Sequence, residues 1–323
     1  MGEHLLFAIE TRDLTRRYGQ FIAVDDLNLQ VPVGALFGLI GPNGAGKTTT
    51  LRMLAGLLEP SGGEILLNGQ KAQIDGKTFR QQIGYMPDFF GVYEDMLVWE
   101  YLDFFARCHH VPTERRRQLT GELLDLVDLA DKRAEYVESL SRGMRQRLCL
   151  AHALVHDPQI LLLDEPASGL DPRARVEMRE LLRELGAMGK TVVVSSHILA
   201  ELAEMCDQVG IIQHGKLAAS GPVSEIARRA NAGRLLQIAA LADFATVERT
   251  LAAQPGIGRI LELPGRNAPD EQHHLRIEAE FVGDDGAVAH LLNTLVHADI
   301  PILSFTETAG DLEEIFLQLT EPQ

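Results

Sequence analysis

The sequence has little cysteine and no long apolar run, and both absences exclude classes of protein. Its 323 residues include three cysteines, Cys108, Cys149 and Cys206, which are far apart and form no C-x-x-C pair. Dispersed thiols in odd number fit a reduced, cytoplasmic environment and argue against a disulfide framework or a cysteine metal site. Since no 18 apolar residues run uninterrupted, we expect no membrane-spanning helix. Residues 1–13 also lack the basic and apolar regions of a signal peptide.

Positive charge is scarce as well. The chain has 30 Lys and Arg against 46 Asp and Glu, a formal net charge of −16. A surface that follows nucleic acid or binds anionic lipid needs clustered Lys and Arg, so we expect neither partner. The histidine pairs His109-His110 and His273-His274 have no third or fourth metal ligand at a suitable spacing, which favours solvated surface over a metal site.

The most informative segment that is present is Gly41-Pro42-Asn43-Gly44-Ala45-Gly46-Lys47-Thr48-Thr49. Its first eight residues fit the phosphate-binding pattern G-x-x-x-x-G-K-[ST], between the apolar run 36–40 and an expected helix. Backbone N–H groups of such a loop hold phosphate oxygens, Lys47 reaches the β- and γ-phosphates, and the Thr48 hydroxyl binds Mg²⁺. The alternative is a glycine-rich turn without a ligand. With every position of the pattern filled, the sequence predicts that the chain binds a nucleoside triphosphate.

A second acidic motif supplies what hydrolysis requires beyond a phosphate loop. The apolar run Ile160–Leu163 ends in Asp164-Glu165. We expect Asp164 to hold Mg²⁺ and Glu165, directed elsewhere by strand alternation, to be the general base for the attacking water. An exposed acidic pair at a strand end is common, but together with the phosphate loop it predicts a hydrolytic site.

Patterning along the chain predicts an α/β protein of two domains. Residues 5–34 alternate as antiparallel strands, and the runs 160–163 and 191–194 are typical of buried parallel strands. Helical spacing dominates residues 98–129, inside an insert of about residues 89–150. We therefore expect a P-loop NTPase core with a parallel central sheet, an antiparallel β subdomain and a helical insert, together spanning residues 1–230.

Residues 231–323 have an organisation of their own. Strands are expected at 235–241, 257–263, 275–281 and 300–305, and helices at 245–253 and 287–296. This βαββαβ order predicts a small ferredoxin-like α+β domain with an accessory role. After it, Leu312, Ile315, Phe316 and Leu319 form an apolar stripe.

Further motifs, taken in order, give the chain a specific resemblance. Leu140-Ser141-Arg142-Gly143-Met144-Arg145-Gln146-Arg147 is similar to the signature LSGGQ-x-x-R of ATP-binding cassette (ABC) transporter ATPases. Ser168-Gly169-Leu170-Asp171 resembles the D-loop of that family, His197 its switch histidine, and Tyr18 the aromatic that stacks on adenine. The resemblance covers residues 5–222.

The resemblance implies a function and partners. By this resemblance, Ser141 and Gly143 contact the γ-phosphate of an ATP that the opposing subunit holds. This implies a head-to-tail dimer, here a homodimer, with two ATP molecules and Mg²⁺ at the interface. It also implies a separate membrane permease, whose loop contacts a groove near residues 88–95, and a location on the inner face of the cell membrane. The C-terminal extension resembles the exporter branch for drugs, lipids or polysaccharides. The alternative is a soluble ABC-type ATPase that remodels a macromolecular complex.

Four positions depart from the family pattern. Asp88 stands where glutamine usually contacts Mg²⁺ and water; aspartate is shorter but still offers an oxygen, so we keep Asp88 as a catalytic and metal-binding residue. Arg142 replaces a usual glycine and Met144 a usual glutamine. Because Ser141 and Gly143 are intact, we expect function to persist. Ala167, where threonine is frequent, is expected to be neutral.

Overall fold

A computed structural model describes residues 7–72, 76–89, 91, 93, 95–230, 234–263 and 275–308. The chain divides into two compact units, Met1–Val223 and Ser224–Gln323. The division lies at the start of helix α8 (Val223–Ala230), whereas the sequence prediction placed the boundary at the end of this helix. Each unit is described by itself below.

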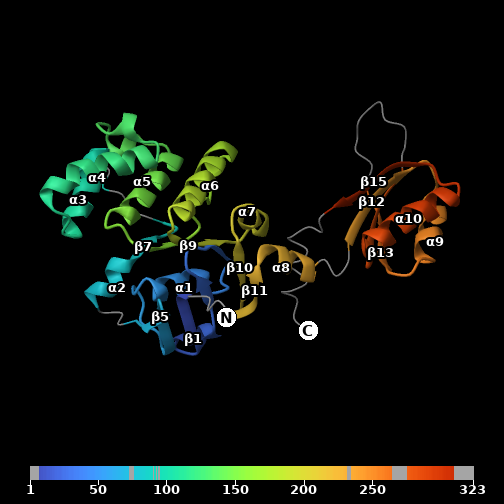
Figure 1. The fold of residues 1–323 in the computed structure, drawn as a ribbon, viewed down its shortest axis with the longest axis horizontal. Helices are drawn as coiled ribbons and strands as arrows, with labels where there is room; N and C mark the ends of the chain where they lie inside the picture. Colours follow the sequence, from blue (N-terminus) through green and yellow to red (C-terminus); the bar gives the residue numbers. More distant parts are fainter. Residues whose placement is uncertain are drawn as a thin grey trace, which may run out of the picture. The chain divides into compact units, whose positions relative to one another are not determined.

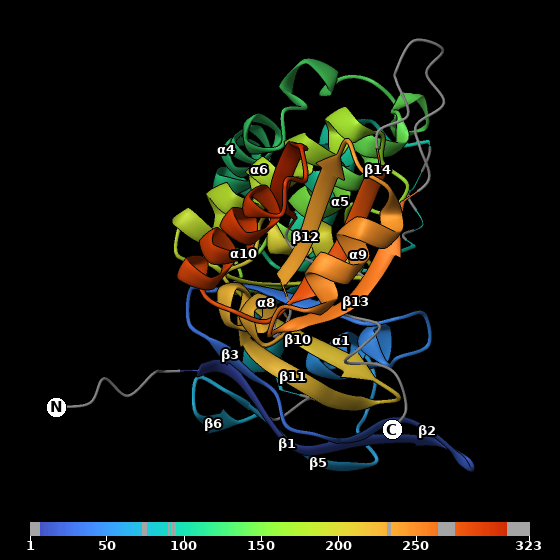
Figure 2. The same cartoon turned by 90° about the vertical axis from the view of Figure 1, so that its right-hand side faces the viewer.

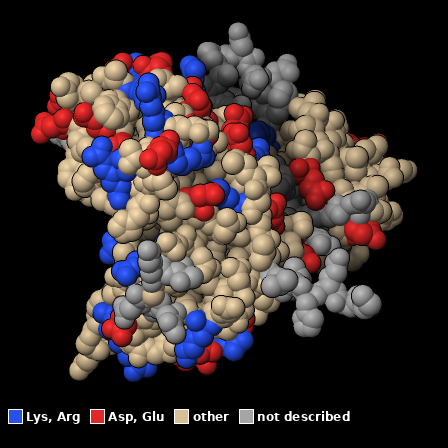
Figure 3. All heavy atoms as spheres, turned by 60° about the vertical axis from the view of Figure 1, so that its left-hand side comes forward, with Lys and Arg blue, Asp and Glu red and all other residues tan. Residues whose placement is uncertain are grey.

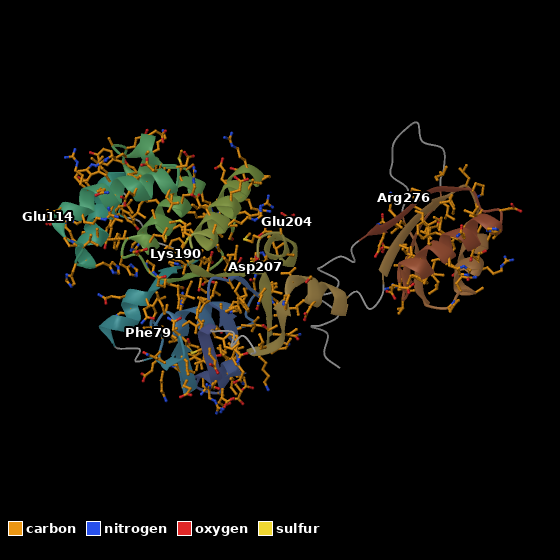
Figure 4. The ribbon with its side chains drawn as sticks, in the orientation of Figure 1. Phe79, Glu114, Lys190, Glu204, Asp207 and Arg276 are labelled. Carbon is orange, nitrogen blue, oxygen red and sulfur yellow. The ribbon has the colours of Figure 1, made fainter. Side chains whose placement is uncertain are left out.

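The centre of the first unit is a six-stranded sheet with the order β11-β10-β4-β9-β8-β7. Its strands are β4 (Leu36–Ile40), β7 (Ile83–Met86), β8 (Ile160–Leu163), β9 (Thr191–Ser196), β10 (Gln208–Gln213) and β11 (Lys216–Pro222). All neighbours are parallel except β11, which pairs antiparallel with β10. Asp207, labelled in Figure 4, joins two strands of the sheet because its Oδ2 accepts a hydrogen bond from the Leu36 N–H. The predicted parallel central sheet is confirmed.

A second, antiparallel sheet lies on one side of the central sheet (Figure 1). It consists of β1 (Phe7–Tyr18), β2 (Phe21–Leu27), β3 (Gln30–Pro32), β5 (Gly62–Leu67) and β6 (Gln70–Lys71). Helix α1 (Lys47–Leu54) packs between the sheets, and its Leu51, Met53 and Leu54 share one buried core with residues of both. Phe79 of α2 (Lys77–Gln82), also labelled in Figure 4, joins that core. This is the expected antiparallel β subdomain.

Helices cover the opposite side of the central sheet (Figure 1). They are α3 (Val98–Cys108), α4 (Thr113–Leu126), α5 (Arg142–Leu154), α6 (Pro172–Ala187) and α7 (Leu199–Ala203), with short 3₁₀ turns at Ala130–Lys132 and Val137–Ser139. The helical block predicted at 98–129 is two helices, because His110 adopts a positive φ of 60° and Pro112 follows it. On the face drawn in Figure 3, Lys and Arg are interspersed with Asp and Glu.

The second unit is a four-stranded antiparallel sheet with two helices on one face (Figure 2). Its elements are β12 (Arg234–Ala240), α9 (Phe244–Ala252), β13 (Ile257–Glu262), β14 (Leu275–Phe281), α10 (Asp285–His297) and β15 (Ile302–Thr308). The strand order is β13-β14-β12-β15, and all pairs are antiparallel. Alternate residues such as Ile277 and Ala279 are buried against Val247 and Leu295 of the helices. The stripe predicted at 312–319 and the pair His273-His274 lie outside the described residues.

Candidate nucleotide-binding site

The phosphate loop leads from the carboxyl end of β4 into α1, where parallel α/β sheets bind ligands. Two glycines make its path possible. Gly44 adopts a φ of +83°, which favours glycine, and Gly46 has a φ of +109°. A Cβ on Gly46 would lie 2.6 Å from the Ala23 carbonyl of β2, and a Cβ on Gly41 would meet the backbone carbonyl of Ile212. At Gly41 and Gly46 the loop therefore follows the neighbouring backbone so closely that no side chain fits.

Lys47 opens α1 and is 5% exposed. Its Nζ donates hydrogen bonds to the carbonyl oxygens of Gly41, at 2.5 Å, and Pro42, at 3.4 Å. The same atom lies 3.4 Å from Oε1 of Glu165, whose side chain is 13% exposed. A buried ammonium beside a loop of backbone N–H groups makes this a site for anions.

Glu165 is the centre of a small polar network. Its backbone has a φ of +50°, a conformation uncommon for a residue with a side chain. This geometry turns the carboxylate away from β8, so that Oε2 lies 3.0 Å from Nδ1 of His197 while Oε1 faces Lys47. The Glu165 N–H donates to Ser195 Oγ at 2.9 Å. A carboxylate between a lysine and a histidine is well placed to accept a proton from water.

Strand pairing brings the predicted groups together. Ile40 lies beside Ser196 in the β4–β9 register, so the loop after β4 is next to His197. Met86 lies beside Leu163 in the β7–β8 register, and the Asp164 N–H donates to the Met86 carbonyl at 2.8 Å. Residues that follow four strands, β4, β9, β8 and β7, are thus assembled at one edge of the sheet.

Asp164 is buried and partly unpaired. It is 1% exposed, and its Oδ1 accepts a hydrogen bond from Ser195 Oγ at 2.7 Å. Its Oδ2 is buried without a partner among the described residues. Thr48 and Asp88 line the cavity described below, and with the unpaired Asp164 oxygen they supply the oxygen donors that Mg²⁺ prefers. These residues fit a Mg²⁺ ion held jointly with phosphate oxygens.

These groups surround a cavity of about 420 Å³. Its described lining residues are Tyr18, Phe21, Ala23, Pro42, Asn43, Gly44, Ala45, Gly46, Lys47, Thr48, Thr49, Asp88, Glu165, Ser168 and His197. Two other predicted site residues close to the loop do not line the cavity: Gly41, whose carbonyl accepts a hydrogen bond from Lys47, and the buried Asp164. Ser141, Gly143 and Asp171 do not line it either.

Sequence reasoning missed three lining residues, Phe21, Ala23 and Ser168. Phe21 pairs with Tyr18 across the β1–β2 hairpin, and both rings are exposed, at 63% and 47%. The Arg16 guanidinium lies 4.7 Å from the centre of the Tyr18 ring. Two exposed aromatic rings at the rim can stack on a nucleobase. The two-residue turn Gly19-Gln20 between them is the signal that could have identified Phe21.

The signature segment forms a separate structure. Ser141 is the N-cap of α5, and its Oγ accepts from the Met144 N–H at 3.3 Å. Asp171 is the N-cap of α6 and accepts from the Ala174 N–H at 2.9 Å. A Cβ on Gly143 would lie 3.2 Å from the Cβ of Ala174, so the starts of α5 and α6 are in close contact. The side chains at both caps are bound locally and are exposed.

Known proteins are similar to this chain in sequence. A family model described as ABC transporter matches residues 24–168. Nod factor export ATP-binding protein I of Burkholderia orbicola is 43% identical over 213 residues, which are 66% of this chain and 70% of that protein. Daunorubicin/doxorubicin resistance ATP-binding protein DrrA of Streptomyces peucetius is 34% identical over 314 residues, 97% of this chain and 92% of that protein.

Known structures share the fold of the first unit. A dimeric structure of the bacterial ABC transporter cassette MJ0796 superposes with a TM-score of 0.61 and 25% identity. The match covers 67% of this chain and 98% of that cassette. The chain is similar in sequence to DrrA along almost the whole length of both proteins, and its structure assembles a phosphate-binding site at one edge of the central sheet. These two observations agree, and the chain belongs to the ATP-binding proteins of ABC transporters.

Proposed function

We propose that the chain is the ATP-binding and ATP-hydrolysing subunit of an ABC exporter and acts as a homodimer on a separate membrane permease. One observation carries the proposal. Lys47, Glu165 and His197 converge on one cavity, whereas the signature residues Ser141 and Gly143 lie outside it. One chain therefore offers two different halves of a site, and a head-to-tail pair of chains would complete both.

Each residue of the cavity has a chemical role in this proposal. The loop N–H groups and Lys47 bind the phosphates, and Tyr18 with Phe21 stacks on the adenine. Glu165 accepts a proton from the attacking water, and His197, 3.0 Å from Glu165, donates a hydrogen bond to the γ-phosphate. Thr48, Asp88 and Asp164 would hold Mg²⁺, which neutralises phosphate charge and orients the leaving group.

The dimer follows from the charge pattern of the two halves. The N-terminal end of α5, capped by Ser141, presents backbone N–H groups and has no acidic residue in its first turn. Such an end attracts phosphate. ATP bound at the loop of one subunit would therefore lie between the subunits, and its hydrolysis would release them. The match to a dimeric cassette supports this arrangement.

Export through a permease is supported by the Nod factor and drug-resistance relatives. Among the described residues, no helix has the length and apolarity to cross a bilayer. A groove of about 770 Å³ borders the helical insert between α4 and the ends of α5 and α6, with Leu119, Leu123 and Val155 in its lining. At its rim the buried Lys190, labelled in Figure 4, binds Asp157 Oδ1 at 2.7 Å. We propose this groove on the helical insert as the permease contact at the inner membrane face; the described residues within 88–95, which the sequence resemblance suggested for that contact, do not line it.

The Glu165→Gln variant tests the proposal. Glutamine preserves shape but cannot take a proton, so ATP hydrolysis should fall at least about 100-fold while ATP binding persists. The unhydrolysed nucleotide should then hold two chains together, which size-exclusion chromatography with ATP and Mg²⁺ would detect as a dimer.

Glu180→Gln is the matched control, since Glu180 lies on the exposed face of α6 and should behave as wild type. Full turnover by Glu165→Gln, or a variant that stays monomeric with bound ATP, would refute the assigned roles.

A further inference from the structure

Arg142 does more than replace a signature glycine. It is the first residue of α5, directly after Ser141, and its Nη2 donates a hydrogen bond to the Ser168 carbonyl at 2.9 Å. This carbonyl belongs to the loop between Glu165 and α6. A charged donor on a carbonyl forms one of the stronger kinds of hydrogen bond.

The loop is shaped to receive the Arg142 side chain. Gly169 has a φ of +66°, and a Cβ added there would collide with the Arg142 guanidinium, which therefore lies directly over the glycine. Gln146, one turn further along α5 and 3% exposed, donates from Nε2 to the same Ser168 carbonyl at 3.1 Å. Two side chains of α5 thus converge on one backbone oxygen. The Arg142 guanidinium therefore contacts both the Ser168 carbonyl and the Gly169 backbone position.

The contact joins the two halves described above. Ser168 lines the nucleotide cavity with Glu165 and His197, and its N–H donates to the Glu165 carbonyl at 3.0 Å. Ser141 and Gly143, at the other end of the contact, are the residues assigned to the opposing nucleotide. Arg142 therefore connects a residue that lines one cavity with the residues assigned to the opposing nucleotide.

We propose that Arg142 is a positioning residue that holds the start of α5 against the Ser168-Gly169 backbone and so couples the cavity of its own subunit to the nucleotide of the opposing one. The inference rests on the proposed head-to-tail function. Arg142 does not itself line the cavity, and so it acts through Ser168 and Ser141 and not through bound ATP.

The test compares steady-state ATP hydrolysis of the full chain with Arg142→Ala, Arg142→Lys and Arg173→Ala. We expect Arg142→Ala to lower kcat about tenfold with the KM for ATP changed less than about twofold, because Lys47 and the phosphate loop are unchanged while Ser168 and the facing signature are misplaced. Lysine can reach the carbonyl with one donor but cannot lie flat over Gly169, so Arg142→Lys should recover part of the loss.

Arg173→Ala is the matched control. Arg173 also lies at the start of a neighbouring helix, its side chain is 90% exposed, and its Nε binds Glu177. It should leave kcat within about twofold of wild type, as surface substitutions usually do. Thermal unfolding followed by the fluorescence of Trp99, the single tryptophan, should be the same for all variants, which separates positioning from loss of fold.

Dimers that combine two different variants test both ends of the Arg142 contact. When Glu165→Gln silences one subunit, hydrolysis is confined to the cavity of the other. Arg142→Ala should then lower the remaining activity whether it is placed in the active subunit, where it loosens Ser168, or in the silent one, where it displaces the facing signature.

Equal kcat for Arg142→Ala and Arg173→Ala, or a loss accompanied by an equal rise in KM, would overturn the inference. A wild-type chain that hydrolyses no ATP would instead contradict the proposed function, so the two failures are distinguishable.

Discussion

Two parts of the first unit differ in how deeply their polar side chains are buried. One is the phosphate loop with the strand ends beside it, here the loop side, and the other is the starts of α5 and α6, here the signature side. On the loop side, Lys47 and Asp164 are 5% and 1% exposed, and Glu165 contacts both Lys47 and His197. On the signature side, Ser141 and Asp171 are exposed, and their side chains only cap their own helices. Buried charges need partners close by, whereas exposed caps are free to meet a second surface. The loop side therefore forms a cavity within the chain, whereas the signature side exposes its polar groups for contact with another surface.

The largest effect is expected from the loop side. Lys47→Met removes the buried ammonium to which we assign phosphate binding and leaves Glu165 without its cationic neighbour. We expect ATP hydrolysis to fall at least about 100-fold and ATP affinity to weaken, because charge stabilisation in a water-poor site is a dominant catalytic contribution. Hydrolysis assays and nucleotide titration would measure both.

Lys71→Met is the control, since Lys71 is 72% exposed and pairs only with Glu64 in the salt bridges of the described residues. A Lys47→Met protein with near-normal hydrolysis would erase the difference between the two sides.

We expect the stability of the protein to depend on pH through two histidines near the C-terminal end of α5, the helix that begins at the signature. Burial lowers the pKa of His152 and of His156 to about 4 each, and repulsion by His109, whose ring stacks on His156, adds to both shifts. A histidine in the unfolded chain has a pKa of about 6.5, so below that pH the unfolded chain binds more protons than the folded chain. Stability is therefore full above about pH 6.5 and declines toward pH 4. We expect the unfolding temperature, followed by Trp99 fluorescence, to drop by at least about 5 °C between pH 7 and 5.

His156→Gln should reduce that drop, because glutamine can replace the hydrogen bond between His156 Nε2 and the Ile83 carbonyl but takes up no proton. His290→Gln, on an exposed position of α10, should leave the drop unchanged. Identical pH profiles for the two variants would show that the buried ring is not the cause.

The smallest effect is expected at Asp88, which is exposed at the rim of the cavity. Asp88→Gln keeps a side-chain oxygen and removes a negative charge near the phosphates. We expect kcat to stay within about threefold of wild type or to rise, and the Mg²⁺ concentration for half-maximal activity to increase, because a neutral amide oxygen binds Mg²⁺ less tightly than a carboxylate. Asp88→Ala, which removes the oxygen, should lose more activity. An inactive Asp88→Gln enzyme would show that the aspartate itself is required.

Much of the fold could be read from local patterns. The run at 160–163 is β8, and the run at 191–194 lies in β9. Where the prediction was coarse, the cause is local. Within the helical block at 98–129, Pro112 was the local signal of a break, whereas the positive φ at His110 could not be predicted because it is set by the chain around it.

The candidate site was predictable in composition but not in its connections. Motif spacing identified Lys47, Glu165 and His197, yet not that one carboxylate faces both the lysine and the histidine. Phe21 lacked a motif, and Arg142 looked like a tolerated replacement until its contact with the Ser168 carbonyl was seen. Such contacts join residues far apart in the chain, which no local pattern encodes.

The sequence by itself determined the chemistry of this protein, because a phosphate loop, an acidic strand end and a helix cap each depend on residue types at short spacing. The tertiary structure alone decided which of these groups share a cavity. Parallel pairing of β4, β9, β8 and β7 places the residues after these strands at one edge, and the packing of α5 against α6 keeps Ser141 outside the cavity. The physical reason is that register and helix packing act between distant segments, so they exist only in the folded chain.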